Sequence, residues 1–514
     1  MPSPRHFIRF CLGLAILLLG IAHASPLPRA TPESAGLDSA KLSSMLDYLR
    51  TQGFETESVL LARHGKLVLD AYYAPFRPGM PHQVNSVAKS VTATLVGQAI
   101  SDGRLNLTDT VGEILPQYRD LPAAKITVEE LLQMKSGMIW NDFVGRDRSS
   151  SWEKIMQHED WIGEFLRQPI DPEQIGTFNY NSVGSALLAA MTEKAVGRPL
   201  LEYAQERLFG PLGIDNFRWL TTTGGQINGG RGLYITPADM LRFGELFRQN
   251  GQWQGQEIVP AAWASAATQP VLPVQANTEN PYYYGYHWWV FKDRQWFAAR
   301  GWGGQYIVVY PAEDMTLVVT SRRPDGERNS TEIDFTALRE YFITPATSSL
   351  PANPAAFAKL QAKAANWGET IAVKNQRSPL EKRLNGRTIE IGSDFWFSRL
   401  EMKFKGNELM LGVTTRDVGN RPLYQQSEPT WQQVAGLDGQ WRDTPRPPVK
   451  NQIVQSGPES LISSRAQWLD QKTLLLETLW LDESWAYRIK LNFDGNKVRL
   501  EQLGGVEVAT GTLR

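Results

Sequence analysis

The chain has 514 residues, of which 42% are hydrophobic and 21% are charged, and its formal net charge is −1. This length is too great for one ordinary domain and is sufficient to bury two cores. A nearly neutral chain without a basic run lacks the electrostatic surface that nucleic-acid binding requires, so no nucleic-acid partner is expected.

The first 24 residues have the pattern of a secretory signal peptide. Two arginines precede an apolar run at 10–22, a small-x-small cleavage site follows at 22–24, and the run is too short to cross a bilayer. The only cysteine, Cys11, lies within this segment, so the exported chain would depend on its core rather than on disulfides. No later apolar run is long enough for a membrane helix, so a periplasmic or secreted protein without a transmembrane anchor is expected.

Residues 30–345 mix helical and strand patterns. Asp38 can cap a helix that runs to Thr51, and a strand hairpin follows at 57–73. Periodicity and capping signals then predict helices at 86–101, 126–137, 182–197 and 235–251. Strand patterns return at 282–292, 295–301, 305–311 and 315–322. One last helix is predicted at 331–343. Strands from both ends of the segment predict one antiparallel sheet flanked by helices.

The composition changes after residue 345. Residues 346–383 are rich in Pro, Ala and Ser and indicate a linker with one short helix. Residues 384–514 contain short alternating strands, with hairpin signals at Gly406-Asn407 and Asp494-Gly495. They predict a separate all-β domain, either a small barrel or a sandwich. The expected fold class is α+β, with an antiparallel sheet, a helical subdomain and a C-terminal all-β domain.

Two segments contain Ser-x-x-Lys, a pattern short enough to arise by chance: Ser86 with Lys89, and a second copy at 151–154. In the second copy a capping box of Ser150 and Glu153 explains the pattern without any chemistry.

The first copy could also be a helix cap, with Lys89 extended to solvent. However, the helix that begins near Ser86 is unusually apolar and is therefore expected to be buried, with Lys89 one turn along the same face. Burial would lower the pKa of Lys89 and let its neutral amine accept the Ser86 proton. The helix N-terminus would favour the negative charge that develops on the acyl oxygen.

Other hydrolase chemistries have few candidates. Four histidines remain after the signal segment, and none belongs to a Gly-x-Ser-x-Gly elbow or a metal-binding pattern: His64, His82, His158 and His287. No metal site and no cofactor are expected. A serine enzyme without histidine needs another base.

Three elements, in this order, make the chain resemble a known superfamily. The first, residues 82–116, carries the Ser-x-x-Lys pattern; the second is Tyr180-Asn181-Ser182; the third is Gly301-Trp302-Gly303. They are similar to motifs of the penicillin-recognising serine hydrolases, which include class C β-lactamases, DD-peptidases, related esterases and 6-aminohexanoate-dimer hydrolases. The resemblance covers roughly residues 30–345 and implies a serine β-lactamase/DD-peptidase-like fold.

The resemblance also implies a mechanism. Ser86 would form an acyl-enzyme, Lys89 and Tyr180 would share the acid and base roles, and water would release the acyl group. Ser182 would either face the site or cap the following helix, and Tyr180 has the alternative of a core aromatic. The oxyanion would be bound by the amide of Ser86 and by one of three later amides, those of Gly303, Gly304 and Gln305.

The sequence departs from the superfamily in two elements. The second ends in Ser182 rather than asparagine, and Gly301 stands where β-lactamases and DD-peptidases have a lysine or histidine that helps bind the substrate carboxylate. Arg300 is adjacent, but alternation along a strand turns it to the opposite side. Without an anion clamp, a small-molecule ester or short amide is the expected substrate, with Trp302 among the binding residues.

Two alternative functions stay open: a DD-peptidase or β-lactamase-like enzyme acting on peptidoglycan peptides or β-lactams, and a non-catalytic cell-wall-binding or signalling protein. The polar segment 141–165 is a candidate lid over the site. The oligomeric state and the role of the β domain are open. Four aromatic side chains are expected either to line an acyl pocket or to belong to the core: Trp140, Phe143, Trp302 and Tyr306.

Overall fold

The computed structural model describes most of the chain. The described residues are 27–51, 55–142, 151–156, 158–274, 281–322, 333–342, 349–368, 377–392, 395, 397–415, 430–446, 457, 460–484, 486–502 and 507–514. The signal peptide predicted at 1–24 lies outside them. None of the helices in these ranges is long and apolar enough to cross a membrane.

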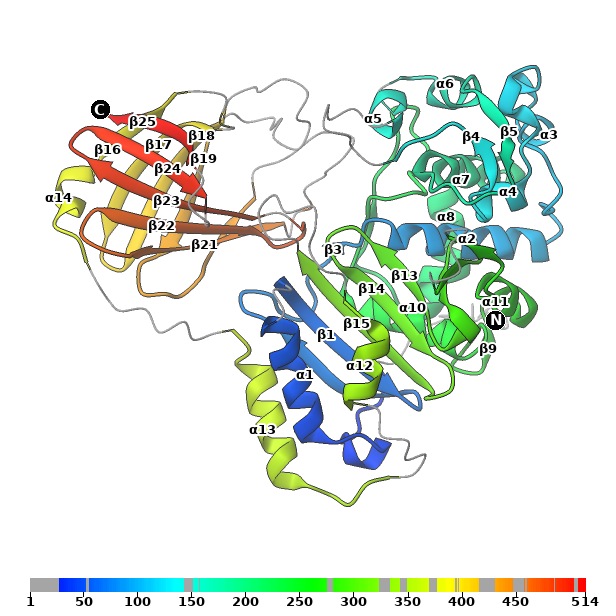
Figure 1. Ribbon diagram of the computed structural model, residues 1–514, viewed down its shortest axis with the longest axis horizontal. Helices are drawn as coiled ribbons and strands as arrows, with labels where there is room; N and C mark the ends of the chain where they lie inside the picture. The colour runs from blue at the N-terminus through cyan, green and yellow to red at the C-terminus, as the bar shows by residue number, and fades with distance from the viewer. Residues whose placement is uncertain are drawn as a thin grey trace, which may run out of the picture.

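An eight-stranded sheet forms the centre of the N-terminal part of the molecule, in the order β10-β11-β12-β13-β14-β15-β1-β2 (Figure 1). Its strands pair antiparallel throughout and are β1 (Glu55–Arg63), β2 (Lys66–Tyr72), β10 (Leu272–Pro273), β11 (Tyr282–Tyr284), β12 (Trp289–Phe291), β13 (Phe297–Gly301), β14 (Gln305–Tyr310) and β15 (Met315–Arg322). Because β1 lies between β2 and β15, strands from both ends of the segment share one sheet. The predicted antiparallel sheet and the α+β fold class are confirmed.

Helices cover both faces of this sheet. The first face carries α1 (Ser39–Thr51), α12 (Phe335–Phe342) and α13 (Pro354–Ala365), and the second carries α2 (Val87–Ser101) and α10 (Pro237–Arg248). Alternate residues of β1 contribute to the two cores, with Val59 and Leu61 on the α1 side and Leu60 and Ala62 on the α2 side. A sheet that is buried on both faces needs apolar residues at nearly every position, which explains the continuous apolar runs of its strands.

Helix α1 is the one predicted after Asp38, whose carboxylate accepts a hydrogen bond from the Ala40 amide at 2.7 Å. The short helix expected within 346–383 is α13, and it lies alongside α1 (Figure 1). Lys363 of α13 donates to Asp47 of α1 at 2.6 Å. Helix α13 therefore packs as part of the layer that covers the sheet.

The helical subdomain and the remaining connections consist of short helices. These are η1 (Glu33–Ala35), α3 (Val111–Ile114), η2 (Pro116–Tyr118), η3 (Pro122–Lys125), α4 (Val128–Leu132), α5 (Ser151–Ile155), α6 (Trp161–Leu166), α7 (Ser182–Val196), α8 (Leu200–Ala204), η4 (Gln205–Phe209), α9 (Gly210–Leu212), α11 (Ala261–Ala267) and η5 (Lys292–Arg294). The capping box predicted at Thr127 opens α4. The helix ends at Leu132 and not at the predicted Gly137, because Met134 already has a positive φ that no α-helix allows.

Three small ladders complete this part of the described fold. They are β3 (His82–Gln83) with β7 (Leu233–Ile235) and β6 (Arg218–Trp219), β4 (Ser136–Met138) with β5 (Ile170–Ile175), and β8 (Gln252–Trp253) with β9 (Gln256–Glu257). Strand β3 matters most for the site, because Ser86 follows it by three residues.

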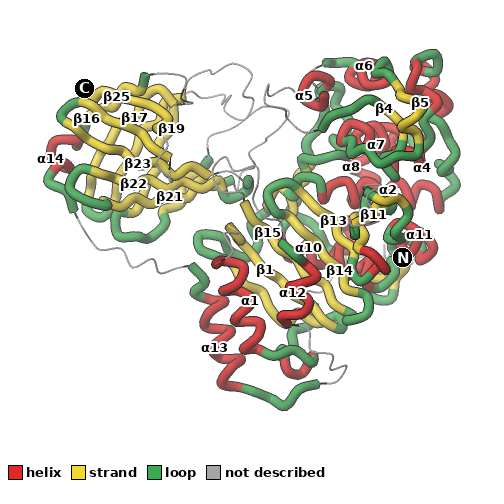
Figure 2. The backbone as a smooth tube through the Cα atoms, viewed as in Figure 1, coloured by secondary structure: helices red, strands yellow, loops and turns green. Residues whose placement is uncertain are grey.

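The C-terminal domain is a closed β-barrel with helix α14 (Leu380–Leu384) at its side (Figure 2). Its strands are β16 (Arg387–Ile391), β17 (Phe397–Lys405), β18 (Glu408–Thr415), β19 (Thr430–Gly436), β20 (Arg442–Pro445), β21 (Leu461–Trp468), β22 (Thr473–Trp480), β23 (Ala486–Asp494), β24 (Lys497–Gln502) and β25 (Glu507–Leu513). Nine of these strands close the barrel through a parallel pairing of β19 with β21, and β20 adds a pairing to β21. The all-β prediction is confirmed, as a barrel and not a sandwich.

Candidate active site

Ser86 lies at the junction between β3 and α2. The preceding residue, Asn85, has a φ of +48°, and the helix begins at Val87. Asparagine tolerates this left-handed conformation better than most residues, which makes the sharp entry into the helix possible. The Ser86 side chain makes no capping hydrogen bond to the helix, so the cap explanation for this serine is wrong.

Lys89 lies one turn along α2 with its amine directed at Ser86. Its Nζ is 3.0 Å from Ser86 Oγ, 2.8 Å from Ser182 Oγ and 2.7 Å from the carbonyl oxygen of Gly230. Only 1% of Lys89 is exposed, so the alternative in which this lysine extends to solvent is also wrong. The three nearest polar partners are uncharged, and each can accept a hydrogen bond.

The pKa of Lys89 is lowered to about 7, chiefly because burial penalises the ammonium form. Two charged groups act in opposite directions: the Asp142 carboxylate raises this pKa, and the Arg231 guanidinium lowers it. A lysine with this pKa is partly neutral near pH 7. It can therefore accept the proton of Ser86, which an ordinary surface lysine cannot do.

Ser182 and Tyr180 reach the site from the start of α7. Asn181 caps this helix, since its Oδ1 accepts from the Gly184 amide at 2.9 Å, and the capping role suggested for Ser182 is therefore wrong. The Ser182 hydroxyl instead contacts Lys89 and donates to Asp142 Oδ2 at 2.5 Å. Ser182 thus links the buried amine to a carboxylate.

Tyr180 lies on the other side of Lys89, whose Nζ is 4.9 Å from the ring centroid. Burial raises the pKa of Tyr180 and Asp142 raises it further, while a hydrogen bond with Ser86 and the charge of Arg300 lower it by less. The phenol is therefore protonated at neutral pH and hydrogen-bonded to the serine. Before substrate binds, the site therefore holds a neutral Tyr180 phenol beside a partly neutral Lys89 amine, and not a phenolate paired with an ammonium.

The third predicted element consists of the last residue of a strand and the turn that follows it. Strand β13 ends at Gly301 and β14 begins at Gln305, so the intervening residues form the hairpin connection, in which the Gly304 amide donates to the Gly301 carbonyl at 3.2 Å. The turn lies against the Ser86 segment, because Asn85 Nδ2 donates to the carbonyl oxygen of Trp302 at 2.9 Å. The side chain of Gln305 is buried and donates to Ser321 O at 2.6 Å.

No side chain fits at Gly301. A Cβ atom there would lie 2.2 Å from the carbonyl oxygen of Val84, so a lysine or histidine is excluded by the backbone itself. The guanidinium of Arg300 lies 4.8 Å from the ring of Trp289 and 5.9 Å from that of Tyr306, and its charge lowers the pKa of Tyr180. The position that binds carboxylates in penicillin-recognising enzymes is therefore filled by backbone.

The aromatic candidates separate clearly. Trp302 is 44% exposed beside Ser86, whereas Trp140 and Tyr306 are buried core residues that pack against Phe165 and Phe335. Phe143 and the other residues at 143–150 of the candidate lid lie outside the described residues, so the lid stays a prediction.

Sequence reasoning missed two half-buried aromatic residues beside Tyr180. The Trp289 ring lies 6.0 Å from the Tyr180 ring at a tilt of 31°, and Phe178 lies 6.0 Å from Trp289. Both lie in segments predicted only as generic strand or loop.

Three other contributors to the site were also missed. Asp142, Gly230 and Arg231 surround Lys89, yet the sequence assigned none of them a role in the site. The one sequence feature among these three that could have indicated a close backbone contact is the Gly-Gly pair that includes Gly230. In the structure a Cβ at this position would lie 2.3 Å from Ser182 O. This close contact brings the Gly230 carbonyl to the lysine.

The second Ser-x-x-Lys copy lies in α5. Lys154 is exposed, and Ser151 exchanges hydrogen bonds with the backbone of Asn141. Ser150 lies outside the described residues, so its predicted cap stays a prediction. Lys154 provides a natural control for experiments on Lys89.

Comparisons with known proteins point to the same chemistry. The family model Beta-lactamase matches residues 42–340, more than half of the chain. The 6-aminohexanoate-dimer hydrolase of Paenarthrobacter ureafaciens is 26% identical over 332 residues, which cover 60% of this chain and 84% of that protein. Penicillin-binding protein 4 of Amycolatopsis lactamdurans is 33% identical over 135 residues, covering 26% of this chain and 34% of that protein. Among solved structures, a candidate 6-aminohexanoate-dimer hydrolase of Bacillus anthracis has a TM-score of 0.50 at 18% identity and covers 67% of this chain and 88% of that one.

The fold and the arrangement around Ser86 define a serine hydrolase. The chain belongs to the β-lactamase family.

Proposed function

We propose that the protein hydrolyses carboxylic esters or short amides through an acyl-enzyme on Ser86. The observation that carries this proposal is the 3.0 Å contact between Ser86 Oγ and Lys89 Nζ, made by a lysine whose pKa is lowered to about 7. A nucleophile within hydrogen-bonding reach of a base, with the base oriented by a third group, is the arrangement that acyl transfer requires. Here Ser182 and Gly230 orient the base.

In the first half-reaction, Ser86 Oγ bonds to the substrate carbonyl carbon while its proton passes to neutral Lys89. The carbonyl oxygen becomes an oxyanion. The proposed donors to it are the amide of Ser86 and one of the amides of residues 303–305. When the bond to the leaving group breaks, Tyr180 is placed to pass a proton to the departing oxygen or nitrogen and to recover one from Lys89.

In the second half-reaction, water attacks the acyl carbon and its proton passes to Lys89. Ser86 Oγ then leaves the carbon and regains its proton, which releases the carboxylic acid. The same residues serve both halves, because the leaving group of one step occupies the position of the attacking group in the other.

The surroundings of Ser86 favour substrates without a carboxylate beside the reacting bond. The backbone of Val84 excludes a cationic side chain from position 301. Trp302, which follows β13 and contacts Asn85, and the Phe178–Trp289 pair near Tyr180 offer apolar surface for acyl or alkoxy groups. The relative from Paenarthrobacter ureafaciens, a 6-aminohexanoate-dimer hydrolase, supports a short linear amide as the other substrate class.

The proposal is tested with p-nitrophenyl acetate and butyrate. Ser86→Ala is expected to reduce turnover by about 10⁴-fold or more, and a fluorophosphonate probe is expected to label Ser86 in the parent. Lys89→Met is expected to abolish turnover, whereas Lys154→Met, the same change in the second Ser-x-x-Lys copy, is expected to leave it unchanged. A Ser86→Ala protein as active as the parent, or the absence of any adduct, would refute the proposal.

A substrate panel separates this function from its alternatives. Esters and the 6-aminohexanoate dimer are expected to be cleaved faster than D-Ala-D-Ala peptides and nitrocefin, because no cation occupies position 301. Faster cleavage of nitrocefin would instead make the protein a β-lactamase, and adduct-free binding of cell-wall peptides would make it a binding protein.

We also propose that the chain is exported. The basic start, the apolar run at 10–22 and the small residues at 22–24 support this. N-terminal sequencing of protein recovered from a bacterial periplasm is expected to begin at Ser25; a chain that retains its first residues inside the cell would contradict export.

A further inference from the structure

A loop of the barrel is buried in the contact with the hydrolase domain. It comprises Leu481–Ser484, between β22 and β23, and is called here the 481–484 loop. All four residues are buried, and Glu483 has no exposed surface. Hairpin loops normally run over the surface, and carboxylates are rarely buried without partners. The burial of Asp482 and Glu483 therefore depends on what the loop contacts.

The first contact is with the strand that leads to Ser86. The backbone amide of Gln83 in β3 donates to the carbonyl oxygen of Asp482 at 2.9 Å. On its other side, Gln83 pairs with Tyr234 of β7. The barrel loop thus completes the hydrogen bonding of β3, three residues before the proposed nucleophile. Without Asp482 a buried amide would lack its partner, which is costly.

The second contact is with the turn between β13 and β14. Gln305 Nε2 donates to Ser484 Oγ at 3.0 Å. The same hydroxyl packs over Gly303, where an added Cβ would lie 2.9 Å from it, and Gly303 has a φ of +84°. Ser484 therefore rests directly on the turn whose amides are the proposed oxyanion donors.

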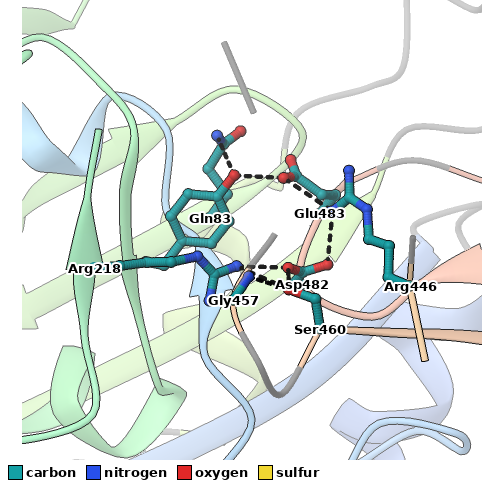
Figure 3. A network of polar contacts seen from close by, with 8 residues as sticks. Gln83, Arg218, Arg446, Gly457, Ser460, Asp482 and Glu483 are labelled. Carbon is teal, nitrogen blue, oxygen red and sulfur yellow. Dashed lines mark hydrogen bonds and ion pairs between the residues drawn. The ribbon is translucent and has the colours of Figure 1, made fainter. Parts of the chain in front are cut away.

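Charges hold the 481–484 loop in place from both domains (Figure 3). Asp482 accepts from Arg446 of the barrel at 3.0 Å and from Arg218 of the hydrolase domain at 2.5 Å. Glu483 accepts from the Tyr234 hydroxyl and lies 3.4 Å from Arg446. The Arg218 guanidinium also stacks 3.8 Å from the Tyr234 ring. This stacking orients the guanidinium that pairs with Asp482.

From these contacts we infer that the 481–484 loop is a positioning element of the hydrolase site, with Ser484 and Asp482 as its positioning residues. This inference rests on the proposed function. The loop binds both the approach to Ser86, through Asp482, and the 303–305 segment, through Ser484. The barrel is therefore part of the active-site architecture.

The physical reason lies in the geometry of oxyanion binding. The two proposed donors belong to segments more than 200 residues apart, which meet where Asn85 donates a side-chain hydrogen bond to Trp302 and where the Val84 carbonyl oxygen lies against Gly301. Donors stabilise a transition state only when both are held within a few tenths of an ångström of its oxygen. A loop that contacts both segments fixes their spacing, and displacement of one by about 1 Å can cost about 100-fold in rate.

Two full-length variants test this inference: Ser484→Ala, which removes the hydroxyl bound to Gln305, and Arg218→Met, which removes a charged anchor of Asp482. Both are expected to lower kcat for p-nitrophenyl butyrate by about 10- to 100-fold with little change in KM, because the lost spacing affects the transition state more than the bound substrate. The kcat is expressed per site labelled to completion by fluorophosphonate, so unfolded protein does not contribute.

Each variant has a matched control inside the barrel. Ser464→Ala removes another buried hydroxyl that accepts from a glutamine, Gln433 Nε2 at 3.4 Å. Arg465→Met removes another arginine that stacks on an aromatic ring, Trp441 at 4.4 Å, and pairs with a carboxylate. Both controls are expected to lower the melting temperature while the kcat per labelled site stays at the parent value.

The inference is overturned if Ser484→Ala and Arg218→Met keep the parent kcat per labelled site, whatever happens to their melting temperatures. It is also overturned if the barrel controls lose kcat to the same degree, because the effect would then be one of general stability. Should one interface variant fail to fold, the other decides. A parent protein that is neither labelled nor active would instead refute the proposed function, which keeps the two failures distinct.

Discussion

Two ionisable side chains beside Ser86 are shifted in opposite directions by the same cause. Burial penalises the charged form of each, so it lowers the pKa of Lys89 and raises that of Tyr180. Both residues are therefore brought toward neutrality, and a neutral amine with a neutral phenol can accept and supply protons in turn. In the proposed mechanism Lys89 acts as the base and Tyr180 as the donor, and this environment explains that division of roles.

The charge of Arg231 provides a direct test of this assignment. Arg231 lowers the pKa of Lys89 and lies 4.5 Å from the Trp152 ring, on which a methionine can also pack. Arg231→Met is expected to raise the pKa of Lys89, so the ascending limb of kcat/KM, near pH 7 in the parent, moves to higher pH. Arg198→Met, which removes an arginine stacked on Tyr203, is the control. A limb that stays in place or moves to lower pH would show that Lys89 is not the group titrated.

At the scale of elements, helix α2 determines where Ser86 and Lys89 stand. Its middle contains Gly97, which normally weakens a helix relative to alanine by about 1 kcal/mol. Here the glycine is required, because a Cβ would lie 2.2 Å from Nε1 of Trp263 on the neighbouring helix α11. The glycine allows the two helices to approach closely, at the cost of a lower helix propensity in α2.

Gly97→Ala is consequently expected to lower the free energy of unfolding by about 1–2 kcal/mol, since overpacking outweighs the gain in propensity. Urea denaturation measures the change. In a Trp263→Leu background, where space is available, the same substitution is expected to cost less or to stabilise. A stabilising Gly97→Ala in the parent would show that the helices can separate without cost.

At the scale of the whole molecule, the domain contact contains a titratable carboxylate. Burial raises the pKa of Glu483 to about 7, Asp482 raises it further, and Arg446, Arg218 and the Tyr234 hydroxyl oppose the shift. Between the ordinary glutamate value and about 7, the folded protein binds more protons than the unfolded chain. The contribution of Glu483 to stability is therefore complete at low pH and is lost as the pH rises through 7.

Glu483→Gln is expected to remove this dependence. Between about pH 4 and pH 8 the free energy of unfolding of the parent is expected to fall by about 3 kcal/mol more than that of the variant, because the glutamine does not ionise. Unfolding free energies measured at several pH values give the difference. Glu477→Gln changes another barrel carboxylate that pairs with arginine, Arg465 at 2.6 Å, and serves as the control. Parallel curves for the parent and Glu483→Gln would contradict the expectation.

Much of the fold followed from local pattern. Alternation and turn residues indicated β1, β2 and β13 to β15, but the single strand predicted at 282–292 is two strands, β11 and β12. The hairpin signals at 406–407 and 494–495 join β17 to β18 and β23 to β24. Capping residues marked α4, α7 and α10. The ends of the elements were predicted less accurately than their types. Helix α4 ends at Leu132 because Met134 and Gly137 turn the chain, and nothing in the apolar spacing indicates that turn.

The sequence by itself determined the two-part architecture and the segments that carry Ser86, Lys89, Tyr180 and Ser182, because periodicity, caps and short motifs are encoded in neighbouring residues. Only the tertiary structure brought Asp142, Gly230 and Arg231 to Lys89, packed the 302–304 connection against Asn85 and buried the 481–484 loop beside the strand that leads to Ser86. These contacts join residues that are far apart in the chain. They depend on how sheets, helices and barrel pack together, which no local pattern records.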